Sequence, residues 1–453
     1  MKKLIIVTLL NCLIVTLSFA QFNTNLLFNW QDSTLTSSYM YDNTYNEIWG
    51  VEVNGAEIAI IGTTAGTHFF DVTNPATATE VAFVAGAYTG DGVVHRDYHD
   101  FGDYLYVVCD EGWSTSTLQI IDISNLPNSV SVVYDSDSLF STTHNIFIDT
   151  ATAKLYTSSA IFSLANPTNP SFLLTYTSVG LPSAHDLYVR NDTAYLNCGP
   201  MGLYIVDFSM IGTPLPVQPN ILATFTAYPD AGYNHSGWLN EEGTIYVMLD
   251  ENHGYDIKLL DVSDLNNISV LSTFNSGVDT NSMAHNAIIK DNYIYVSYYH
   301  DGLRVFNFDN PSNPTQFAYY DTYPHSMTYC AIHNNHLGYK GAWGVYPLFN
   351  SWHVLVSDMQ TGLYVIDMSL PLSTNNIEKE DNSIYPNPAE NQFTIANKKA
   401  TSILLYDIFG KRVMQKSLVN SKTIDRGNLA NGMYFYSLKT KGKIIENGKI
   451  IFE

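Results

Sequence analysis

One pattern of about forty to fifty residues occurs seven times along this chain, and it constrains the fold more than any other feature. The clearest copy runs from Ala284 to Asp321 and contains four short runs of alternating apolar and polar residues, separated by turn residues. A period of this length with four strands in each unit is typical of a β-propeller blade. The sequence therefore predicts an all-β fold whose main body is a seven-bladed β-propeller.

The remaining copies align with this one, and the ends of the series predict how the ring closes. They begin at Glu47, Val94, Thr143, Ala184, Asn234 and Gly341. The last copy stops after its third strand, Gly362 to Asp367. The segment from Asn23 to Leu35 resembles the fourth strand of the other copies, so we expect residues 22–35 to complete the last blade. A ring closed in this way has no unpaired edge at the junction.

The first twenty residues have the pattern of a secretory signal peptide. Two lysines precede an apolar run from Leu4 to Leu17, and Ser18-Phe19-Ala20 forms a small-x-small cleavage site. No other stretch has the length and apolarity of a membrane span, so we expect no transmembrane segment. The cysteines after the signal segment are Cys109, Cys198 and Cys330. They lie in different repeats, which indicates no disulfide framework. The sequence predicts a secreted or extracellular protein.

A change of composition near residue 373 predicts a second domain. We expect the propeller over residues 21–372, a polar linker over 373–383, and a small Ig-like β-sandwich over 384–453. Residues 21–383 hold eight Lys and Arg against 38 Asp and Glu, a net charge of −30. A body this acidic lacks the cationic residues that phosphate contacts need, so the sequence predicts no nucleic-acid partner.

The C-terminal segment carries three short motifs that occur together. They are Tyr385-Pro386-Asn387-Pro388, Tyr406-Asp407-x-x-Gly410-Lys411 and Leu429-x-x-Gly432-x-Tyr434. In this combination the segment resembles the type A C-terminal sorting domain of the type IX secretion system of Bacteroidota. The resemblance implies that the secretion machinery is a partner. It also implies export across the outer membrane, followed by release or attachment to the cell surface.

The phase of the repeat predicts one working face. In an antiparallel blade the start of the first strand, the end of the second and the start of the third share one face. Histidines stand at the start of the first strand in five copies, Trp49 stands there in the first copy, and Trp343 lies near that place in the last. Function commonly lies on loops that a rigid scaffold presents. The candidate binding residues on this face are His95, His144, His185, His235, His285, Asp110, Glu111, Trp113, Asp250, Glu251, His253, Asp301, Tyr323 and Trp343.

The histidines allow two interpretations. Imidazoles gathered around a central channel could bind a transition metal, with His185, His235 and His285 as candidate ligands, and the acidic loops could bind calcium. Alternatively, a histidine repeated at one blade position could hydrogen-bond the neighbouring blade and serve the fold alone. Spacing across separate blades is not a metal motif, so the sequence favours the structural role while leaving a divalent metal open.

An aspartate recurs at the end of the third strand of the blades and has a simpler interpretation. A Ser or Thr stands two residues after this aspartate, within a turn sequence. Such a side chain accepts hydrogen bonds from backbone N–H groups two residues further on. We expect this structural role for Asp71, Asp122, Asp207, Asp261 and Asp367.

The propeller body also resembles a known group of proteins. The matching segments are Leu203–Asp207, Leu363–Asp367, His144–Ile146, Ala184–Asp186, Ala284–Asn286, Tyr320–Pro324 and Gly341–Pro347. They resemble LVIVD-repeat propellers and, more narrowly, the choice-of-anchor B family. The resemblance implies secreted proteins with varied C-terminal anchors, and it supplies no catalytic residues to transfer.

Two classes of function therefore stay open. The first is a secreted or cell-surface binding module that holds a glycan, peptide or protein partner on the histidine face, for which exposed aromatics are suited. The alternative is a metal-dependent extracellular hydrolase or lyase that uses the blade histidines. The sequence has no phosphate loop, G-x-S-x-G elbow or H-E-x-x-H motif, which favours binding over catalysis.

Overall fold

The computed structural model describes residues 21–212, 218–323, 336–369, 384–407, 412–418, 421–440 and 443–453. The chain divides into two compact units, Met1–Ser373 and Thr374–Glu453. The expected signal peptide (1–20) and the expected linker (373–383) lie outside the described residues. No helix in the described ranges has the length and apolarity needed to cross a membrane.

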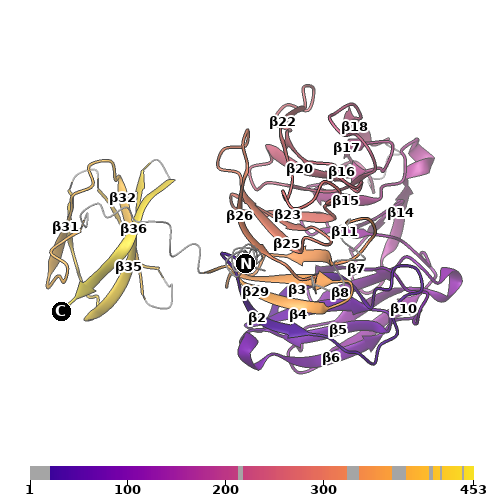
Figure 1. Ribbon diagram of the computed structural model, residues 1–453, viewed down its shortest axis with the longest axis horizontal. Helices are drawn as coiled ribbons and strands as arrows, with labels where there is room; N and C mark the ends of the chain where they lie inside the picture. Colours follow the sequence, from indigo (N-terminus) through magenta and orange to yellow (C-terminus); the bar gives the residue numbers. More distant parts are fainter. Residues whose placement is uncertain are drawn as a thin grey trace, which may run out of the picture. The chain divides into compact units, whose positions relative to one another are not determined.

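The described part of the first unit contains seven antiparallel sheets, which follow one another in sequence order around a ring (Figure 1). Four consecutive strands form each of the first five sheets. The first sheet holds β3 (Tyr45–Val53), β4 (Ala56–Thr63), β5 (Gly66–Asp71) and β6 (Thr79–Ala85), and the second holds β7 (Arg96–Phe101), β8 (Tyr104–Cys109), β9 (Leu118–Asp122) and β10 (Ser131–Ser136). The third holds β11 (Ile146–Asp149), β12 (Lys154–Thr157), β13 (Ala160–Ser163) and β14 (Ser171–Thr175), and the fourth holds β15 (Asp186–Arg190), β16 (Thr193–Asn197), β17 (Leu203–Asp207) and β18 (Asn220–Phe225). The fifth holds β19 (Asn234–Leu239), β20 (Ile245–Asp250), β21 (Ile257–Asp261) and β22 (Ser269–Phe274).

The last two sheets each include a strand from the N-terminal segment. The sixth holds β23 (Asn286–Lys290), β24 (Tyr293–Ser297), β25 (Leu303–Asn307), β26 (Thr315–Tyr320) and, at its edge, β1 (Gln21–Phe22). The seventh holds β27 (Ala342–Tyr346), β28 (His353–Asp358), β29 (Gly362–Asp367) and β2 (Asn25–Trp30). Strand β2 pairs antiparallel with β29 and supplies the fourth strand that the last repeat lacks. The pairing of β1 with β26 was not expected from the sequence.

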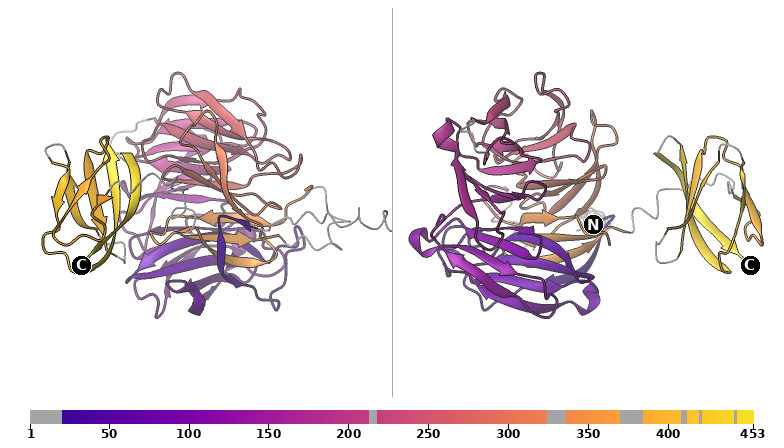
Figure 2. Two further views of the ribbon diagram at one scale, coloured as in Figure 1. Left: turned by 60° about the vertical axis from the view of Figure 1, so that its left-hand side comes forward. Right: turned by 180° about the vertical axis from the view of Figure 1, so that it is seen from behind.

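The first strand of each sheet lies innermost, and these strands close a circle. Strand β27 contacts β3, β3 contacts β7, and the series continues through β11, β15, β19 and β23 back to β27. The two further views in Figure 2 show the same ring from other sides. The all-β propeller predicted from the repeat is confirmed.

The core lies between neighbouring sheets, because each blade packs one face against the blade before it and the other face against the blade after it. Ile58, Ile60 and Phe69 of the first sheet pack against Tyr98 and Leu105 of the second, and all five side chains are fully buried or nearly so. Sheets that pack face to face are held by such alternating inward side chains. Burial of this kind stabilises the fold by about 25 cal/mol for each Å² of apolar surface removed from water.

The recurrent aspartates have the structural role expected from the sequence. The carboxylate of Asp71 accepts a hydrogen bond from the backbone N–H of Thr73 at 3.0 Å, and that of Asp261 accepts one from Ser263 at 2.9 Å. Asp122, Asp207 and Asp367 make the same contact two residues on. These side chains close turns at the opposite ends of the strands from the histidines.

Three short 3-10 helices occur in the loops of the described propeller residues: η1 (Pro75–Thr77), η2 (Trp113–Thr115) and η3 (Tyr176–Val179). Of these, η2 belongs to the predicted working face, because it follows directly on β8. Its first residue, Trp113, has a φ of 48°, and Gly112 before it has a φ of 96°. A bulky residue in the left-handed region is unusual and strained, which marks this loop as a candidate for function.

The C-terminal unit is a small two-layer β-sandwich. One sheet holds β30 (Ile384–Tyr385), β31 (Gln392–Ile395) and β34 (Thr423–Asp425); the other holds β32 (Ser402–Tyr406), β33 (Arg412–Ser417), β35 (Gly432–Thr440) and β36 (Lys443–Phe452). Phe393 and Ile424 from the first sheet pack with Leu405 and Phe452 from the second. This is the sandwich predicted from the alternation of the tail.

The tail motifs have structural roles in this sandwich. The amide of Asn387 donates to the carbonyl oxygen of Lys449 at 2.8 Å and accepts from the N–H of Ile451 at 2.9 Å, which ties the motif to β36. Tyr434 is buried, and its hydroxyl donates to the carbonyl oxygen of Ala430. Tyr385 is exposed. Gly410 and Lys411 lie outside the described residues.

Candidate functional site

Six aromatic side chains form a closed ring at one mouth of the central channel, hereafter the histidine ring. Its members are His95, His144, His185, His235, His285 and Trp343. Successive ring centroids are 4.3, 4.2, 4.3, 4.5 and 4.3 Å apart, and Trp343 closes the circle at 5.5 Å from His95. The structure thus brings together all five predicted histidines and the predicted Trp343.

Each histidine reaches the channel because it stands at the start of an innermost strand. The backbone N–H of His185 donates to the carbonyl oxygen of Asn197, and that of His285 donates to Ser297. These bonds fix the backbone at the end of the sheet. Since side chains alternate between the two sides of a strand, the same position in each blade presents its side chain in the same direction.

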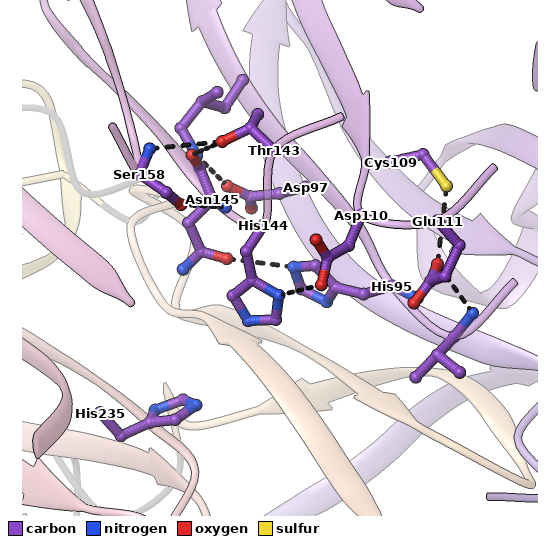
Figure 3. Close-up of polar contacts among 12 residues, drawn as sticks. His95, Asp97, Cys109, Asp110, Glu111, Thr143, His144, Asn145, Ser158 and His235 are labelled. Carbon is purple, nitrogen blue, oxygen red and sulfur yellow. Dashed lines mark hydrogen bonds and ion pairs between the residues drawn. The ribbon is translucent and has the colours of Figure 1, made fainter. Parts of the chain in front are cut away.

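Three of the histidines hydrogen-bond a neighbouring blade. His95 Nε2 lies 3.0 Å from the side-chain oxygen of Asn145, and His144 Nδ1 lies 2.8 Å from a carboxylate oxygen of Asp110 (Figure 3). His285 donates from Nδ1 to the carbonyl oxygen of Trp343 at 2.6 Å. For these three residues the contacts are those that the structural interpretation expects.

His235 lacks such a contact. Its Nδ1 is buried and has no hydrogen-bond partner among the described residues, while its Nε2 lies 3.9 Å from Oε2 of Glu251. The other oxygen of Glu251 accepts a hydrogen bond from the hydroxyl of Tyr299 at 2.5 Å. A ring nitrogen of His235, one of His285 and a carboxylate oxygen of Glu251 all lie within 4.8 Å of one another. These three donors could hold a metal ion.

Burial keeps most of the histidine ring uncharged. Desolvation, followed by the nearby histidines, lowers the pKa of His185 to about 2. Desolvation lowers the pKa of His285 to about 3 and lowers that of His235 well below its usual value. A neutral imidazole carries a lone pair, so it can accept a hydrogen bond or bind a metal.

His144 is the exception within the histidine ring. Burial by itself lowers its pKa, but the hydrogen bond and the charge of Asp110 outweigh burial and leave the pKa raised. The same contact lowers the pKa of Asp110 against the opposing effect of desolvation. The two side chains are partly exposed, and Nδ1 of His144 lies 2.8 Å from the carboxylate of Asp110.

A layer of acids and amides lies beyond the histidine ring, in a cavity of about 570 Å³ that includes open solvent. Its carboxyl groups belong to Glu47, Asp97 and Asp186, and Asn145, Asn286 and Ser236 line it as well. Desolvation raises the pKa of Glu47 to about 8, that of Asp186 to about 6, and that of Asp97 well above its usual value. We call these three groups the carboxyl layer.

Backbone and amide donors hold the carboxyl layer in place. Glu47 accepts from its neighbour Ile48 at 2.9 Å and from the amide of Asn286 at 3.1 Å. Asp97 accepts from the N–H of Ile146 in the next blade at 2.7 Å (Figure 3). The layer therefore also links blades.

A second set of rings lies along the lining of the same cavity and includes Trp49. The ring of Trp49 is tilted against that of His99, with centroids 4.7 Å apart, and lies edge-on to Tyr346 at 5.2 Å, while its Nε1 donates to Asp100 at 2.8 Å. The series continues through Phe147, Tyr188 and Trp238. The expectation that Trp49 stands where other blades have histidine is wrong, because Trp49 packs with His99 and Tyr346 in this second set of rings and not in the histidine ring.

Exposed aromatic side chains surround the mouth. Trp113 is 85 % exposed on the loop that also carries Asp110. Tyr233 is 38 % exposed and lies edge-on to His185, with ring centroids 5.1 Å apart. Tyr41 and Tyr339 are half-buried and lie 5.0 Å apart, and desolvation, followed by the charge of Glu251 among other groups, raises the pKa of both. Exposed aromatics beside carboxylates make this mouth suited to binding a polar ligand.

Several other predicted residues are engaged in internal contacts. Asp250 forms a fully buried ion pair with Lys258 at 3.0 Å. Asp301 is buried 2.8 Å from His336, and Tyr323 is buried against His300. Glu111 accepts from the N–H groups of Val94 and His95. His253 is half-buried and accepts from the N–H of Gly338.

Sequence reasoning did not single out the carboxyl layer or the tyrosines of the mouth. A signal was present for part of the layer, because the residue after each histidine is polar in all five copies. Asn145, Asp186, Ser236 and Asn286 occupy those positions and line the cavity. Arg96 also follows a histidine but bonds the carbonyl oxygens of Thr63 and Tyr88 instead.

The comparisons with known proteins agree with both units. Residues 383–453 match the family described as "Secretion system C-terminal sorting domain". This type IX sorting domain indicates export through the secretion system to the cell surface or the extracellular space. No curated protein matches the chain in sequence.

Solved structures with similar folds are WD40-type propellers. The structure of U3-55K is 10 % identical with a TM-score of 0.50, and the match covers 76 % of this chain and 98 % of that one. The WD40 repeats of RRP9 are also 10 % identical with a TM-score of 0.50, and the match covers 76 % of this chain and 97 % of that one. At this identity the likeness shows the fold alone. The chain is therefore an exported β-propeller with a C-terminal secretion-system sorting domain.

Proposed function

We propose that this protein is an extracellular binding module that holds a glycan at the mouth of its channel. The observation that carries the proposal is Trp113, whose indole is 85 % exposed on a loop with unusual backbone angles. An exposed indole held by a strained loop is costly for the fold alone and useful as a flat platform for a ligand. It stands three residues after Asp110, on the loop whose carboxylate pairs with His144.

The polar groups of the mouth suit a ligand rich in hydroxyl groups. Carboxylates accept hydrogen bonds from hydroxyls, and a neutral imidazole accepts through one nitrogen and donates through the other. Asp110 and Glu251 supply the carboxylates, and the histidine ring supplies the imidazoles. The strongly negative propeller disfavours anionic ligands, so a neutral glycan fits better than an acidic one.

A glycan array probed with the full-length secreted protein tests the proposal. We expect binding to a neutral glycan, and we expect W113A and Y233A each to weaken it about tenfold, since one aromatic platform contributes about 1.4 kcal/mol. F172A is the matched control, because Phe172 is a 57 % exposed aromatic on the outer strand β14. It should bind as the wild type does.

Two outcomes would contradict the glycan assignment. One is the absence of binding to every neutral glycan on the array. The other is full binding by W113A. Capture of a peptide or protein instead, with loss in W113A, would keep the mouth as the binding site and assign the ligand to the other class.

A second candidate function is a metal-dependent extracellular hydrolase or lyase. The observation that favours it is the group formed by His235, His285 and Glu251, whose donor atoms lie within 4.8 Å of one another. Hydrolysis of a bound glycan that requires added metal and is lost in E251Q would establish this function. The resemblance to the choice-of-anchor B family fits either candidate, with the sorting domain as the anchor that we propose.

A further inference from the structure

We propose that His235, His285 and Glu251 bind one divalent transition-metal ion at the channel mouth, with zinc as the ion that fits this donor set best. The site rests on its own geometry and does not require that the mouth bind a glycan.

Strand register brings the three donors together from two blades. His235 lies in β19 and Glu251 directly follows β20, and the pairing of Asn234 with Asp250 sets their backbones side by side at the same sheet end. His285 stands just before β23 in the next blade. Its ring centroid is 4.5 Å from that of His235. No local motif connects the three positions, which is why the sequence pattern did not predict this set.

Two of the donors have partners of the kind that orient metal ligands. His285 donates from Nδ1 to the carbonyl oxygen of Trp343, so its Nε2 carries the lone pair. Glu251 accepts the hydroxyl of Tyr299 on Oε1, which leaves Oε2 facing Nε2 of His235. Metal-bound histidines and carboxylates usually make such second contacts, which fix their orientation.

The third donor has no contact that accounts for its burial. His235 is 2 % exposed, yet among the described residues its Nδ1 has no partner, and its Nε2 has only Glu251 at 3.9 Å. A buried polar atom without a partner is unfavourable. The other four histidines of the ring each contact a neighbouring blade through a side-chain or backbone hydrogen bond. Nδ1 of His95 and of His185 is also buried without a partner in the described part of the chain, so what sets His235 apart is its Nε2, which faces Glu251 at 3.9 Å, beyond hydrogen-bond distance.

The separations require only a small adjustment. Tetrahedral zinc with bonds of about 2.0–2.1 Å places its donor atoms about 3.4 Å apart. The distance from His235 to Glu251 is 3.9 Å, and all three donors lie within 4.8 Å. Glu251 is the least buried of the three, so its side chain can move inward. Three protein ligands leave a fourth position open, as in zinc sites that bind water or substrate.

The donor types select the ion. Calcium and magnesium prefer sites made of oxygen ligands, whereas imidazole suits zinc, copper, iron and nickel. Two imidazoles and one carboxylate therefore favour a transition metal over the calcium that the acidic loops had suggested. His185 is not among the three described residues whose donor atoms gather within 4.8 Å, and its ring hydrogen-bonds the His235 backbone.

Zinc binding by the full-length protein tests the inference. After chelation and dialysis, titration with zinc chloride followed by metal analysis should give one ion per chain. We expect Y299F to weaken zinc binding by about tenfold, and E251Q to weaken it by at least about a hundredfold. H235A/H285A should abolish saturable binding. Cobalt in place of zinc should give the visible absorption of a low-coordinate site.

The controls separate metal binding from folding. H353A removes a histidine that pairs with Glu57 at 2.7 Å, at the opposite end of β28 from the channel mouth, and should bind zinc normally. E251Q preserves the shape of the side chain, and thermal unfolding should show that it is folded. Absence of saturable zinc binding by the wild type, equal affinity in folded E251Q, or tighter binding of calcium than zinc would each overturn the inference.

The same protein distinguishes this inference from the proposed function. Glycan binding by the chelated wild type would uphold the glycan site whatever the zinc result. Zinc binding without any glycan bound would uphold the metal site alone.

Discussion

His285 donates a hydrogen bond from Nδ1 to the carbonyl oxygen of Trp343, 2.6 Å away in the next blade. The same imidazole is a member of the histidine ring and one of the two imidazoles that lie beside Glu251. One side chain thus joins two blades and leaves its second nitrogen for a ligand. The structural and metal-binding interpretations of the histidines are compatible at this position, since they use different ring atoms.

The contact between His95 and Asn145 predicts energetic coupling between blades two and three. Their side chains are buried and lie 3.0 Å apart. A double-mutant cycle with H95A and N145A, measured by urea unfolding, should give a coupling energy of about 0.5–1.5 kcal/mol. Strictly additive effects of the two substitutions would show that the contact does not link the blades.

The N-terminal strand predicts a large effect of one aromatic residue and a small effect of another. Trp30 in β2 packs 4.7 Å from Phe70 and 5.6 Å from Tyr45, in a neighbouring blade. W30A should destabilise the propeller by about 3 kcal/mol, because it leaves a cavity where the ring closes. F22A removes a 51 % exposed ring from β1 and should cost less than about 1 kcal/mol. Equal losses of unfolding free energy would contradict closure through β2.

The buried carboxyl group of Glu47 should make the free energy of unfolding depend on pH. Burial raises its pKa to about 8 from an ordinary value of 4.5. Between these values the folded chain keeps a proton that the unfolded chain releases, so the free energy of unfolding falls as pH rises through this window. E47Q should therefore gain stability over the wild type progressively from pH 4.5 to pH 8, by ~2–4 kcal/mol at the upper end.

Unfolding curves at several pH values measure this difference. Asp97 and Asp186 remain in E47Q, so some pH dependence should persist. A constant difference between E47Q and the wild type across the window would show that Glu47 is ionised in the folded protein.

The His144–Asp110 pair predicts a shift that can be followed at a single residue. Asp110 holds the pKa of His144 above its ordinary value of 6.5 in spite of burial. The stability that this pair contributes is present below pH 6.5 and is lost as pH rises through the folded pKa of His144. D110N removes the hydrogen bond and the charge that oppose burial most strongly, so the pKa of His144 measured by NMR titration should fall. An unchanged pKa would mean that Asp110 does not hold the imidazolium.

The sequence was sufficient for the features that depend on strand period and turn chemistry. Blade phase follows from alternation, the pairing of Asn25–Trp30 with β29 follows from a missing strand, and the role of Asp261 follows from the geometry of one turn. Each of these depends on residues close in sequence or on the repeat itself. The gathering of the five histidines also follows from the repeat, because equivalent positions meet at the axis.

The partners of those histidines could not be read from the sequence. Asp250 and Glu251 are adjacent in the chain, yet Asp250 is buried against Lys258 while Glu251 faces His235. Successive side chains at the end of β20 point to opposite sides, and Lys258 of β21 pairs with Asp250, so only Glu251 is left to face His235. Trp343 joins the histidine ring as expected, whereas Trp49 packs with His99 and Tyr346 instead.

Ligand binding at the channel mouth, beside the histidine ring, is tested most directly by a crystal structure with a bound glycan. Crystals of the full-length protein soaked with an array-identified glycan should show the sugar in contact with Trp113 and Tyr233, above the histidine ring. Sugar density confined to the outer strands or to the turns of Asp71 and Asp261 would contradict the account.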